Sequence, residues 1–319
     1  MANTAQRVII DTDIGTDIDD AYALLLALAS PELDIRGITL VHGKVDIRAR
    51  IALKLLKLAG REDIPVIPGE SKPMNPERPI YWPGHEGRGL DFSDISVPSS
   101  SFSVHGARPE NAEPGTKNEE PMWSAVEFIA NQADKDTILL PIGPMTNVGM
   151  AIRDYPSEMA RYKGIVAMAS TFNGFGPENA GGEHNIALDP EAAEIVLDSG
   201  IPIVLAGLNV TLQTSLTRRM VEEISAAGTP LAEFMSLMTE DWFSLVGRDT
   251  TAMHDSTAVA ESFAPDLVET VSVKATVDKA QAGRIAYEVD EDSSVRICTS
   301  LDADGFQKLF FSRILEAVH

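Results

Sequence analysis

The sequence predicts an α/β fold with an open, mostly parallel Rossmann-like sheet, helices on both of its faces, and a single domain. Short apolar segments typical of buried strands alternate with segments of helical periodicity along most of the chain. The 319 residues, 44% of them apolar, contain no repeat, low-complexity tract or break in composition. We therefore expect residues 1–319 to form one packed α/β domain.

The opening of the chain follows a strand-helix-strand-helix order. Strand-like Val8–Asp11 precedes a helical pattern over Asp19–Ser30, and strand-like Ile35–Val41 precedes a second helix over Val45–Ala59. A short strand follows near Val66. This alternation predicts parallel strands, and ligands bind at the carboxyl ends of such strands.

A segment rich in Pro, Gly and Ser follows between Ser71 and Pro121, and it predicts a long loop at about residues 70–121. Loops of this length are usually functional or disordered. Its stretch W-P-G-H-E-G-R-G-L-D, Trp82–Asp91, is either a lid over a site or a surface excursion.

Helical and strand-like segments alternate again after this loop. Asp189 and Pro190 suit the N-cap and first position of a helix, and Pro230 must begin or break a helix within Thr217–Val246. The other expected elements are a helix over Met122–Gln132, a strand over Thr137–Ile142, a helix from Asn147, a strand over Ile165–Ala169, a Gly- and Asn-rich loop over Ser170–Ala187, a strand over Ile203–Ala206, a short helix after Met253–Asp255, two or three strands within Val271–Cys298 and a closing helix from about Asp302.

Composition disfavours several classes of function. The net charge of −22, without clustered Lys and Arg, argues against nucleic acid as a partner. The longest apolar run, Ala21–Ala29, is too short to span a membrane, and acids stand upstream where an export signal carries positive charge. A single cysteine, Cys298, fits a reducing cytoplasm, the location we expect.

The acidic turn after the first strand is the strongest candidate for a site. Five carboxylates, Asp11, Asp13, Asp17, Asp19 and Asp20, lie within ten residues at a strand-to-helix turn. Crowding them costs several kcal/mol at low dielectric unless they take up protons, stay solvated or bind a cation. A hard cation with oxygen ligands, Ca²⁺ or Mg²⁺, resolves this most simply, although part of the cluster also suits helix capping.

Other polar groups follow later strands, at Ile142–Gly143, Glu183–Asn185 and His254–Asp255. In an open parallel sheet these strand ends can share one crevice, where Asp255 would join Asp13 and Asp20. Water beside a metal and a carboxylate is a competent nucleophile, and a nearby imidazole can protonate a leaving group. A lone His-Asp pair is more often a structural hydrogen bond.

Five motifs together resemble one family. They are V-I-I-D-T-D-I-G-T-D-I-D-D-A, G-I-T-L-V-H-G-K, P-I-G-P-M-T-N, G-G-E-H-N-I-A-L-D-P-E-A-A and M-H-D-S-T-A-V-A, and they lie between Val8 and Ala260. In this order they resemble the nucleoside hydrolases, the inosine-uridine preferring N-ribohydrolases. The resemblance implies a Ca²⁺-dependent enzyme that hydrolyses the N-glycosidic bond of ribonucleosides, assembled as a homodimer or homotetramer.

The resemblance also implies roles for individual residues. Asp13, Asp20 and Asp255 would ligate Ca²⁺ with the backbone carbonyl of Ile142, and Asp13 would be the general base on the attacking water. Attack from the face opposite the base predicts inversion at the anomeric carbon.

The remaining implied roles concern the substrate. Asp19, Glu183 and Asn185 would hold the ribose hydroxyls, Asn179 would lie beside them, and His254 would face the leaving base.

Three residues depart from the family pattern. The usual acidic turn is two residues shorter, so Asp17 is an additional carboxylate. Lys44 stands near the substrate and the water, where the family usually has an asparagine, and Asn209 replaces a frequent aspartate. Because of these departures, the resemblance specifies neither the preferred base nor whether the substrate is a nucleoside or another N-riboside.

Two rival interpretations remain. Haloacid-dehalogenase-like phosphatases also begin with an apolar strand and D-x-D and use Mg²⁺, but Gly15 and the Asp19-Asp20 pair do not fit their pattern. A metal-stabilised ribose-binding protein without turnover is motivated by Lys44. The aromatic residues Trp82, Phe175 and Trp242 are either platforms for a base or parts of the core.

Overall fold

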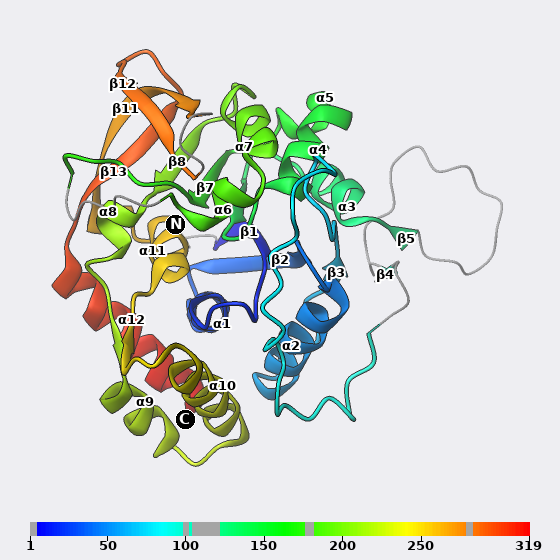
Figure 1. Ribbon diagram of the computed structural model, residues 1–319, viewed down its shortest axis with the longest axis vertical. Helices are drawn as coiled ribbons and strands as arrows, with labels where there is room; N and C mark the ends of the chain where they lie inside the picture. The colour runs from blue at the N-terminus through cyan, green and yellow to red at the C-terminus, as the bar shows by residue number, and fades with distance from the viewer. Residues whose placement is uncertain (1–4, 98–101, 104–121, 176–181, 279–282) are drawn as a thin grey trace.

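A computed structural model describes residues 5–97, 102–103, 122–175, 182–278 and 283–319. Within these residues, a nine-stranded sheet has the order β12-β11-β13-β8-β7-β6-β1-β2-β3 (Figure 1). The strands are β1 (Gln6–Thr12), β2 (Leu33–Leu40), β3 (Val66–Pro68), β6 (Thr137–Pro141), β7 (Gly164–Met168), β8 (Ile203–Ala206), β11 (Val268–Val277), β12 (Ile285–Val289) and β13 (Val295–Leu301).

The sheet is parallel from β13 to β3, whereas β11 pairs antiparallel with β13 and β12. The chain leaves β1 toward β2 and β3 and later builds outward through β6 on the other side, which makes β1 and β6 the switch point of the topology. A crevice opens at the carboxyl ends of strands at such a point. The prediction of an open, mostly parallel sheet is confirmed.

Helices cover both faces of the sheet (Figure 1). Alternate residues of β1 point to opposite faces, so Val8 and Ile10 pack in one buried cluster and Ile9 in another. The first cluster receives α1 (Asp19–Leu28), α2 (Val45–Leu58), α9 (Arg218–Ser225), α10 (Pro230–Val246), α11 (His254–Glu261) and α12 (Ala303–Val318), and the second receives α3 (Ala125–Asn131), α4 (Thr146–Asp154), α6 (His184–Leu188) and α7 (Pro190–Leu197).

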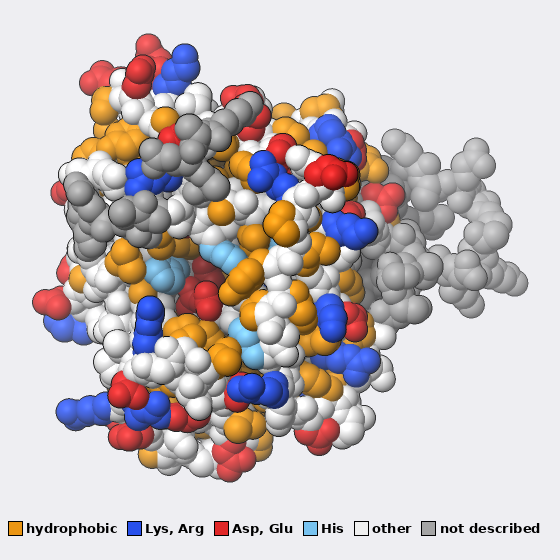
Figure 2. Space-filling view, in the orientation of Figure 1, with side chains coloured by type: hydrophobic (Ala, Val, Ile, Leu, Met, Phe, Trp, Pro, Cys, Tyr) orange, Lys and Arg blue, Asp and Glu red, His pale blue; other side chains and the backbone are white. Residues whose placement is uncertain are grey.

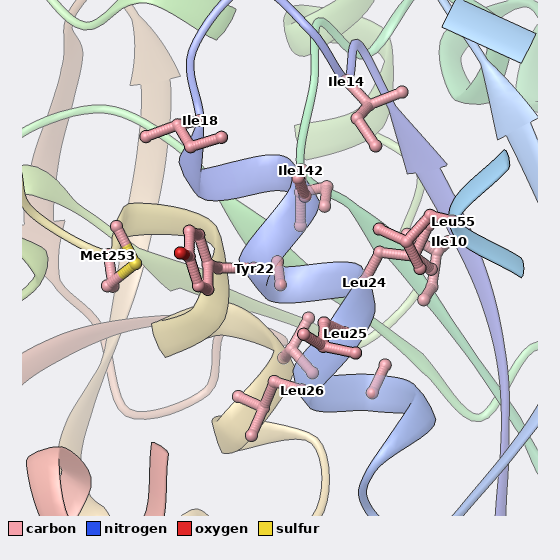
Figure 3. Close-up of a cluster of buried hydrophobic side chains, with 14 of the residues drawn as sticks. Ile10, Ile14, Ile18, Tyr22, Leu24, Leu25, Leu26, Leu55, Ile142 and Met253 are labelled. Carbon is pink, nitrogen blue, oxygen red and sulfur yellow. The ribbon is translucent and has the colours of Figure 1, made fainter. Parts of the chain in front are cut away.

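Helix α1 lies at the centre of the first cluster. Its side chains are buried from Asp19 through Ala27. Figure 3 shows Tyr22 beside Met253, which precedes α11, and Leu24 directed toward Ile10 of β1 and Leu55 of α2. Tyr22 also bonds Thr239 of α10 through its hydroxyl, at 3.0 Å. This burial fixes the position of the helix whose first residues are two of the acids.

Several helix boundaries follow the sequence signals. Helix α7 begins at Pro190, where the Asp189 side chain accepts a hydrogen bond from the Ala192 N–H. Helix α10 begins at Pro230, as the break within Thr217–Val246 requires, and α9 lies before it. Helix α12 begins after Asp302, whose side chain accepts from the Gly305 N–H.

Two expectations were wrong in detail. Met122–Trp123 is a short strand, β5, and helix α3 begins only at Ala125 because Ser124 and Glu127 form a capping box. The expected loop over Ser170–Ala187 ends early, because α6 begins at His184.

Short elements that the periodicity did not indicate complete the described fold. They are β4 (Phe102–Ser103), α5 (Pro156–Met159), α8 (Leu208–Thr211), β9 (Leu216–Thr217), β10 (Thr250–Thr251) and the 3₁₀ turn η1 (Pro265–Leu267). Of the expected long loop, residues 71–97 contain neither helix nor strand, and residues 98–101 and 104–121 lie outside the described residues. No helix of the described part is long and apolar enough to cross a membrane.

Candidate active site

A cavity of about 220 Å³ opens at the carboxyl ends of the parallel strands. In Figure 2 it is the hollow near the centre of the face, where acidic side chains lie between histidines. The polar side chains that line it are Asp13, Thr16, Asp17, Asp19, Asp20, Glu183, His184, Asn185, His254 and Asp255. The structure therefore gathers the separate strand-end motifs at one place.

The acidic turn connects the end of β1 to the start of α1. Gly15 has a φ of +107°, in the left-handed region that favours glycine, and a Cβ there would lie 2.6 Å from Ile51. The Thr12 hydroxyl donates a 2.5 Å hydrogen bond to Oδ1 of Asp20 and accepts one from the Ile14 N–H. The turn thus holds the Asp20 carboxylate in place from the strand before it.

Three carboxylates form a buried cluster that fits a metal ion. Oxygens of Asp19, Asp20 and Asp255 lie within 4.8 Å of one another, and each residue is at most 5% exposed. Asp255 comes from the first turn of α11, and its N–H donates to Oδ2 of Asp19 at 3.4 Å. Residues more than 230 positions apart in the chain therefore converge.

Asp13, expected as a metal ligand, lies beside this cluster and lines the same cavity. Its negative charge is the largest influence after burial that raises the pKa of Asp20. Asp19, expected to hold ribose, is also one of the close cluster of three. Asp13 and Asp19 thus occupy one small region with Asp20 and Asp255.

The cluster gathers several carboxyl groups in a buried place, and their pKa values are raised. Desolvation, and after it the charge of Asp17, raise the pKa of Asp19 to about 8. Desolvation and neighbouring acids also raise the pKa values of Asp20 and Asp255 well above the ordinary range. Carboxylates in this state gain most from a cation, and an all-oxygen set suits a hard ion such as Ca²⁺ or Mg²⁺.

Arg48, which our sequence analysis did not single out, lies fully buried beneath the acidic turn. Its guanidinium donates to the backbone carbonyls of His42, Asp13 and Ile14 and to the Thr16 hydroxyl. One of its nitrogens also lies 3.7 Å from the carboxylate of Asp13. Arg48 therefore fixes the backbone of the turn and places a positive charge below it.

A signal for Arg48 was present in the sequence. Arg48, Ile51 and Leu55 share one face of α2 at spacings of three and four residues, and all three are buried. A charged residue on an apolar face of a helix is rarely left without partners.

Glu183 and Asn185 lie on the opposite wall at the start of α6. Glu183 is its N-cap and accepts hydrogen bonds from the backbone N–H groups of Asn185, Ile186 and Ser170. The Asn185 amide donates to the carbonyl of Ile142 at 2.9 Å. Both side chains are thus held rigidly where they line the cavity.

His254 lines the cavity from the first residue of α11. Its Nδ1 lies 2.7 Å from the Thr211 hydroxyl, which fixes the ring. Burial lowers the pKa of His254 to about 4, although the charge of Asp17 opposes the effect. The imidazole is therefore neutral near pH 7.

Two departures from the family pattern lie outside this cavity. The Lys44 ammonium lies over the Trp82 ring, 5.6 Å from its centroid, and Lys44 is not among the residues that line the cavity. The Asn209 amide donates to the carbonyls of Phe175 and Cys298 within the fold. Asn179 lies outside the described residues.

A second cavity of about 460 Å³ continues from the first. The two share Thr16, Asp17 and His184, and Tyr81 and Trp242 contribute aromatic walls to the second. Of the other aromatic candidates, Trp82 packs against the Gly43 turn and Phe175 against Tyr287. Trp242 thus belongs to a cavity wall, while the other two pack against neighbouring residues.

The loop before residue 91 borders this second cavity. Nε2 of His85 lies 2.7 Å from the Thr16 carbonyl, and the Tyr81 N–H donates to Nε2 of His42. Of the two interpretations of Trp82–Asp91, the contacts favour a segment that lies over the site. Two adjoining cavities, one lined by acids and one with aromatic walls, suit a ligand in which a sugar is joined to a planar ring.

Comparison with known proteins gives the same picture. The family model described as inosine-uridine preferring nucleoside hydrolase matches residues 8–308. The chain belongs to the nucleoside hydrolase family. Members hydrolyse the N-glycosidic bond of ribonucleosides and depend on a metal, and this chain is accordingly an N-glycosyl hydrolase.

Individual relatives span most of this nucleoside hydrolase. The pyrimidine-specific ribonucleoside hydrolase RihA of Salmonella paratyphi A is 35% identical over 280 residues, covering 84% of this chain and 82% of its own. RihA of Shigella boydii is 31% identical, with 97% and 98% covered. The purine-preferring ribonucleoside hydrolase from Gardnerella vaginalis superposes with a TM-score of 0.78 at 28% identity, covering 98% and 99%.

Proposed function

We propose that this hydrolase cleaves ribonucleosides to ribose and free base in a Ca²⁺-dependent reaction, with Asp13 as general base. The observation that carries the proposal is the convergence of Asp13, Asp19, Asp20 and Asp255 in one buried cavity at the carboxyl edge of the sheet. The family supports the reaction. The relatives' names include both a pyrimidine-specific and a purine-preferring hydrolase, so both classes of riboside are candidate substrates.

The ion would be held by Asp20 and Asp255, with Asp13 and the carbonyl of Ile142 completing the protein ligands. These groups offer only oxygen donors, as Ca²⁺ prefers. When bound, the ion would attract the sugar hydroxyls and acidify a neighbouring water. The raised pKa values of Asp20 and Asp255 support this assignment, because a bound cation relieves the repulsion.

Asp13 takes the proton from the attacking water on one of its carboxylate oxygens. Arg48 supports this role because it holds the Asp13 backbone, and one of its nitrogens lies 3.7 Å from the carboxylate. The water attacks the anomeric carbon while the bond to the base breaks and its electron pair moves to the base nitrogen. Attack opposite the base gives inverted ribose.

Asp19, Glu183 and Asn185 orient the ribose hydroxyls. Glu183 and Asn185 are already fixed by backbone partners, so little side-chain entropy is lost on binding. Asn179 is expected beside them.

His254 faces the leaving base as a neutral imidazole. With a pKa of about 4 it holds little cationic form at pH 7, so it contributes a hydrogen bond more readily than a full proton transfer. A cytoplasmic location, a homodimeric or homotetrameric assembly and a contact of Lys44 with substrate stay predictions from the sequence.

The test is release of reducing sugar from a panel of purine and pyrimidine ribonucleosides. The purified protein is treated with a chelator, then assayed with Ca²⁺, with Mg²⁺ and without metal. We expect ribose release that Ca²⁺ restores best. Nucleoside binding without ribose release would support the binding protein instead, and turnover unaffected by chelation would contradict the metal requirement.

A further inference from the structure

Asp17 occupies the border between the two cavities. It is the additional carboxylate of the acidic turn, which is two residues longer than the family usually has, and it lines both the acidic and the aromatic cavity. After burial, its charge is the largest influence on the pKa of Asp19. It therefore lies beside the residues proposed to hold the sugar and extends toward the space for the base.

The carboxylate of Asp17 is only partly used within the protein. Oδ1 accepts a 3.0 Å hydrogen bond from the indole N–H of Trp242. Among the described residues, Oδ2 has no hydrogen-bond partner, and the side chain is exposed. One acceptor oxygen thus remains for a ligand in the cavity.

Other charge in the aromatic cavity is compensated. Arg88, the one cationic side chain among its described lining residues apart from histidines, pairs with Asp241 at 2.7 Å. The remaining wall is formed by Thr16, the imidazoles of His85 and His184, and aromatic, apolar and backbone groups, which carry no carboxylate. A base in this cavity would therefore meet one uncompensated charge, that of Asp17.

We propose that Asp17 makes this hydrolase selective for ribosides whose base presents an amino group, over those that present a carbonyl oxygen at the same position. The proposal rests on the proposed function. A carboxylate only accepts hydrogen bonds, so it attracts an amino group and repels a carbonyl oxygen. Cytidine against uridine, and adenosine against inosine, are pairs of similar shape that differ in this group.

The selectivity arises from binding in the transition state of the same reaction. A site built to bond one polar group discriminates strongly against the analogue that lacks it. A hydrogen bond to a charged group corresponds to about 10- to 100-fold in a rate or binding ratio.

The experiment measures kcat/KM of the Ca²⁺-loaded full chain for all four ribosides. The readout is the ratio of cytidine to uridine, and of adenosine to inosine, in wild type and in Asp17→Asn. Comparing each ratio between wild type and Asp17→Asn cancels the intrinsic difference between the leaving groups, which is the same for both proteins. We expect the substitution to lower at least one ratio about 10-fold or more, mainly by slowing the amino-bearing substrate.

Two variants separate a direct role from an indirect one. Trp242→Phe removes the indole N–H but keeps an aromatic wall, and it should leave the ratios largely unchanged. Asp266→Asn removes an exposed carboxylate from the turn η1 and should alter neither ratios nor rates.

Each outcome bears on a different claim. If Asp17→Asn left both substrate ratios unchanged, Asp17 would have no role in selectivity, although the hydrolase activity would stand. The same conclusion would follow if Trp242→Phe changed the ratios as much as Asp17→Asn does. No ribose from any riboside would instead overturn the proposed function, and the selectivity with it.

Discussion

The two edges of the parallel sheet each carry a charged cavity, and only one of them resembles an active site. At the amino edge, a cavity of about 530 Å³ is lined by residues that precede β1, β2, β6 and β7, among them Glu32, Lys135, Asp136 and Lys163. It is larger than the cavity of about 220 Å³ at the carboxyl edge. The volume of a cavity therefore does not identify the active site.

What differs is burial and compensation. At the amino edge Arg7 and Asp134 form a 3.0 Å ion pair with both side chains more than 40% exposed, and Lys163 bonds Gln6. At Asp134 partial desolvation raises the pKa, but hydrogen bonds, first that of the Asp136 N–H, more than reverse it. At the carboxyl edge, in contrast, burial leaves acids with raised pKa values, so a bound cation would stabilise their ionised form.

Replacing one carboxylate at each edge should give the largest difference in activity between the two cavities. Asp13→Ala removes the proposed general base and should lower kcat/KM for ribose release by about 10²–10⁴-fold. Asp136→Ala removes an acid from the amino edge and should leave kcat/KM within a factor of two. Thermal unfolding should confirm that both variants fold. Equal activity of Asp13→Ala and wild type would remove Asp13 from the mechanism.

The buried and exposed arginines offer a second contrast. Arg48→Met breaks hydrogen bonds to three carbonyls and a hydroxyl and leaves buried acceptors unpaired, so we expect a loss of about 3–5 kcal/mol in unfolding free energy. Arg7→Met breaks an exposed pair and should cost about 0–1 kcal/mol. Urea unfolding in Ca²⁺-containing buffer measures both. Similar losses would mean that the burial of Arg48 contributes little.

Metal removal should make stability depend on pH. The folded pKa of Asp19, about 8, lies above the unfolded value of about 4, so the folded state binds the proton more tightly. This contribution is full below about pH 4 and is lost as pH rises toward 8. The chelated protein should therefore unfold at a lower temperature at pH 8 than at pH 6.

Saturating Ca²⁺ should reduce that dependence, because it stabilises the ionised carboxylates. Melting curves with chelator and with Ca²⁺ at the two pH values provide the comparison. A chelated protein more stable at pH 8 than at pH 6 would contradict the raised pKa values.

The smallest effect is expected at Lys44. Its ammonium lies over Trp82, and Lys44 lines neither cavity at the carboxyl edge. Lys44→Asn, which restores the family's usual residue, should change kcat/KM less than about threefold and cost about 0.5–1 kcal/mol of stability. A gain of more than tenfold in kcat/KM would show instead that Lys44 restrains catalysis.

Much of the fold followed from local pattern. The apolar run of β1, the Asp189-Pro190 start of α7 and the Pro230 start of α10 each carry a signal that acts over a few residues. The apolar pattern over Met122–Gln132 predicts too early a start for α3, because the capping box of Ser124 and Glu127 begins the helix at Ala125.

Side-chain roles were less accessible. Glu183 was expected as a ligand of the sugar, and the structure also makes it the N-cap of α6. The direction of Lys44 depends on where Trp82 packs, and the position of Trp82 depends on a loop without periodicity. No pattern within either segment specifies such a contact.

The sequence alone determined the order of the longer strands and helices, the acidic turn and the family resemblance of its motifs, since these depend on neighbouring residues. Only the tertiary structure decided that Asp19 shares the close cluster with Asp20 and Asp255, that Arg48 lies beneath it and that Asp17 faces two cavities. Packing of the whole chain sets these distances, and burial makes the charge of these aspartates unfavourable unless a positively charged partner is bound.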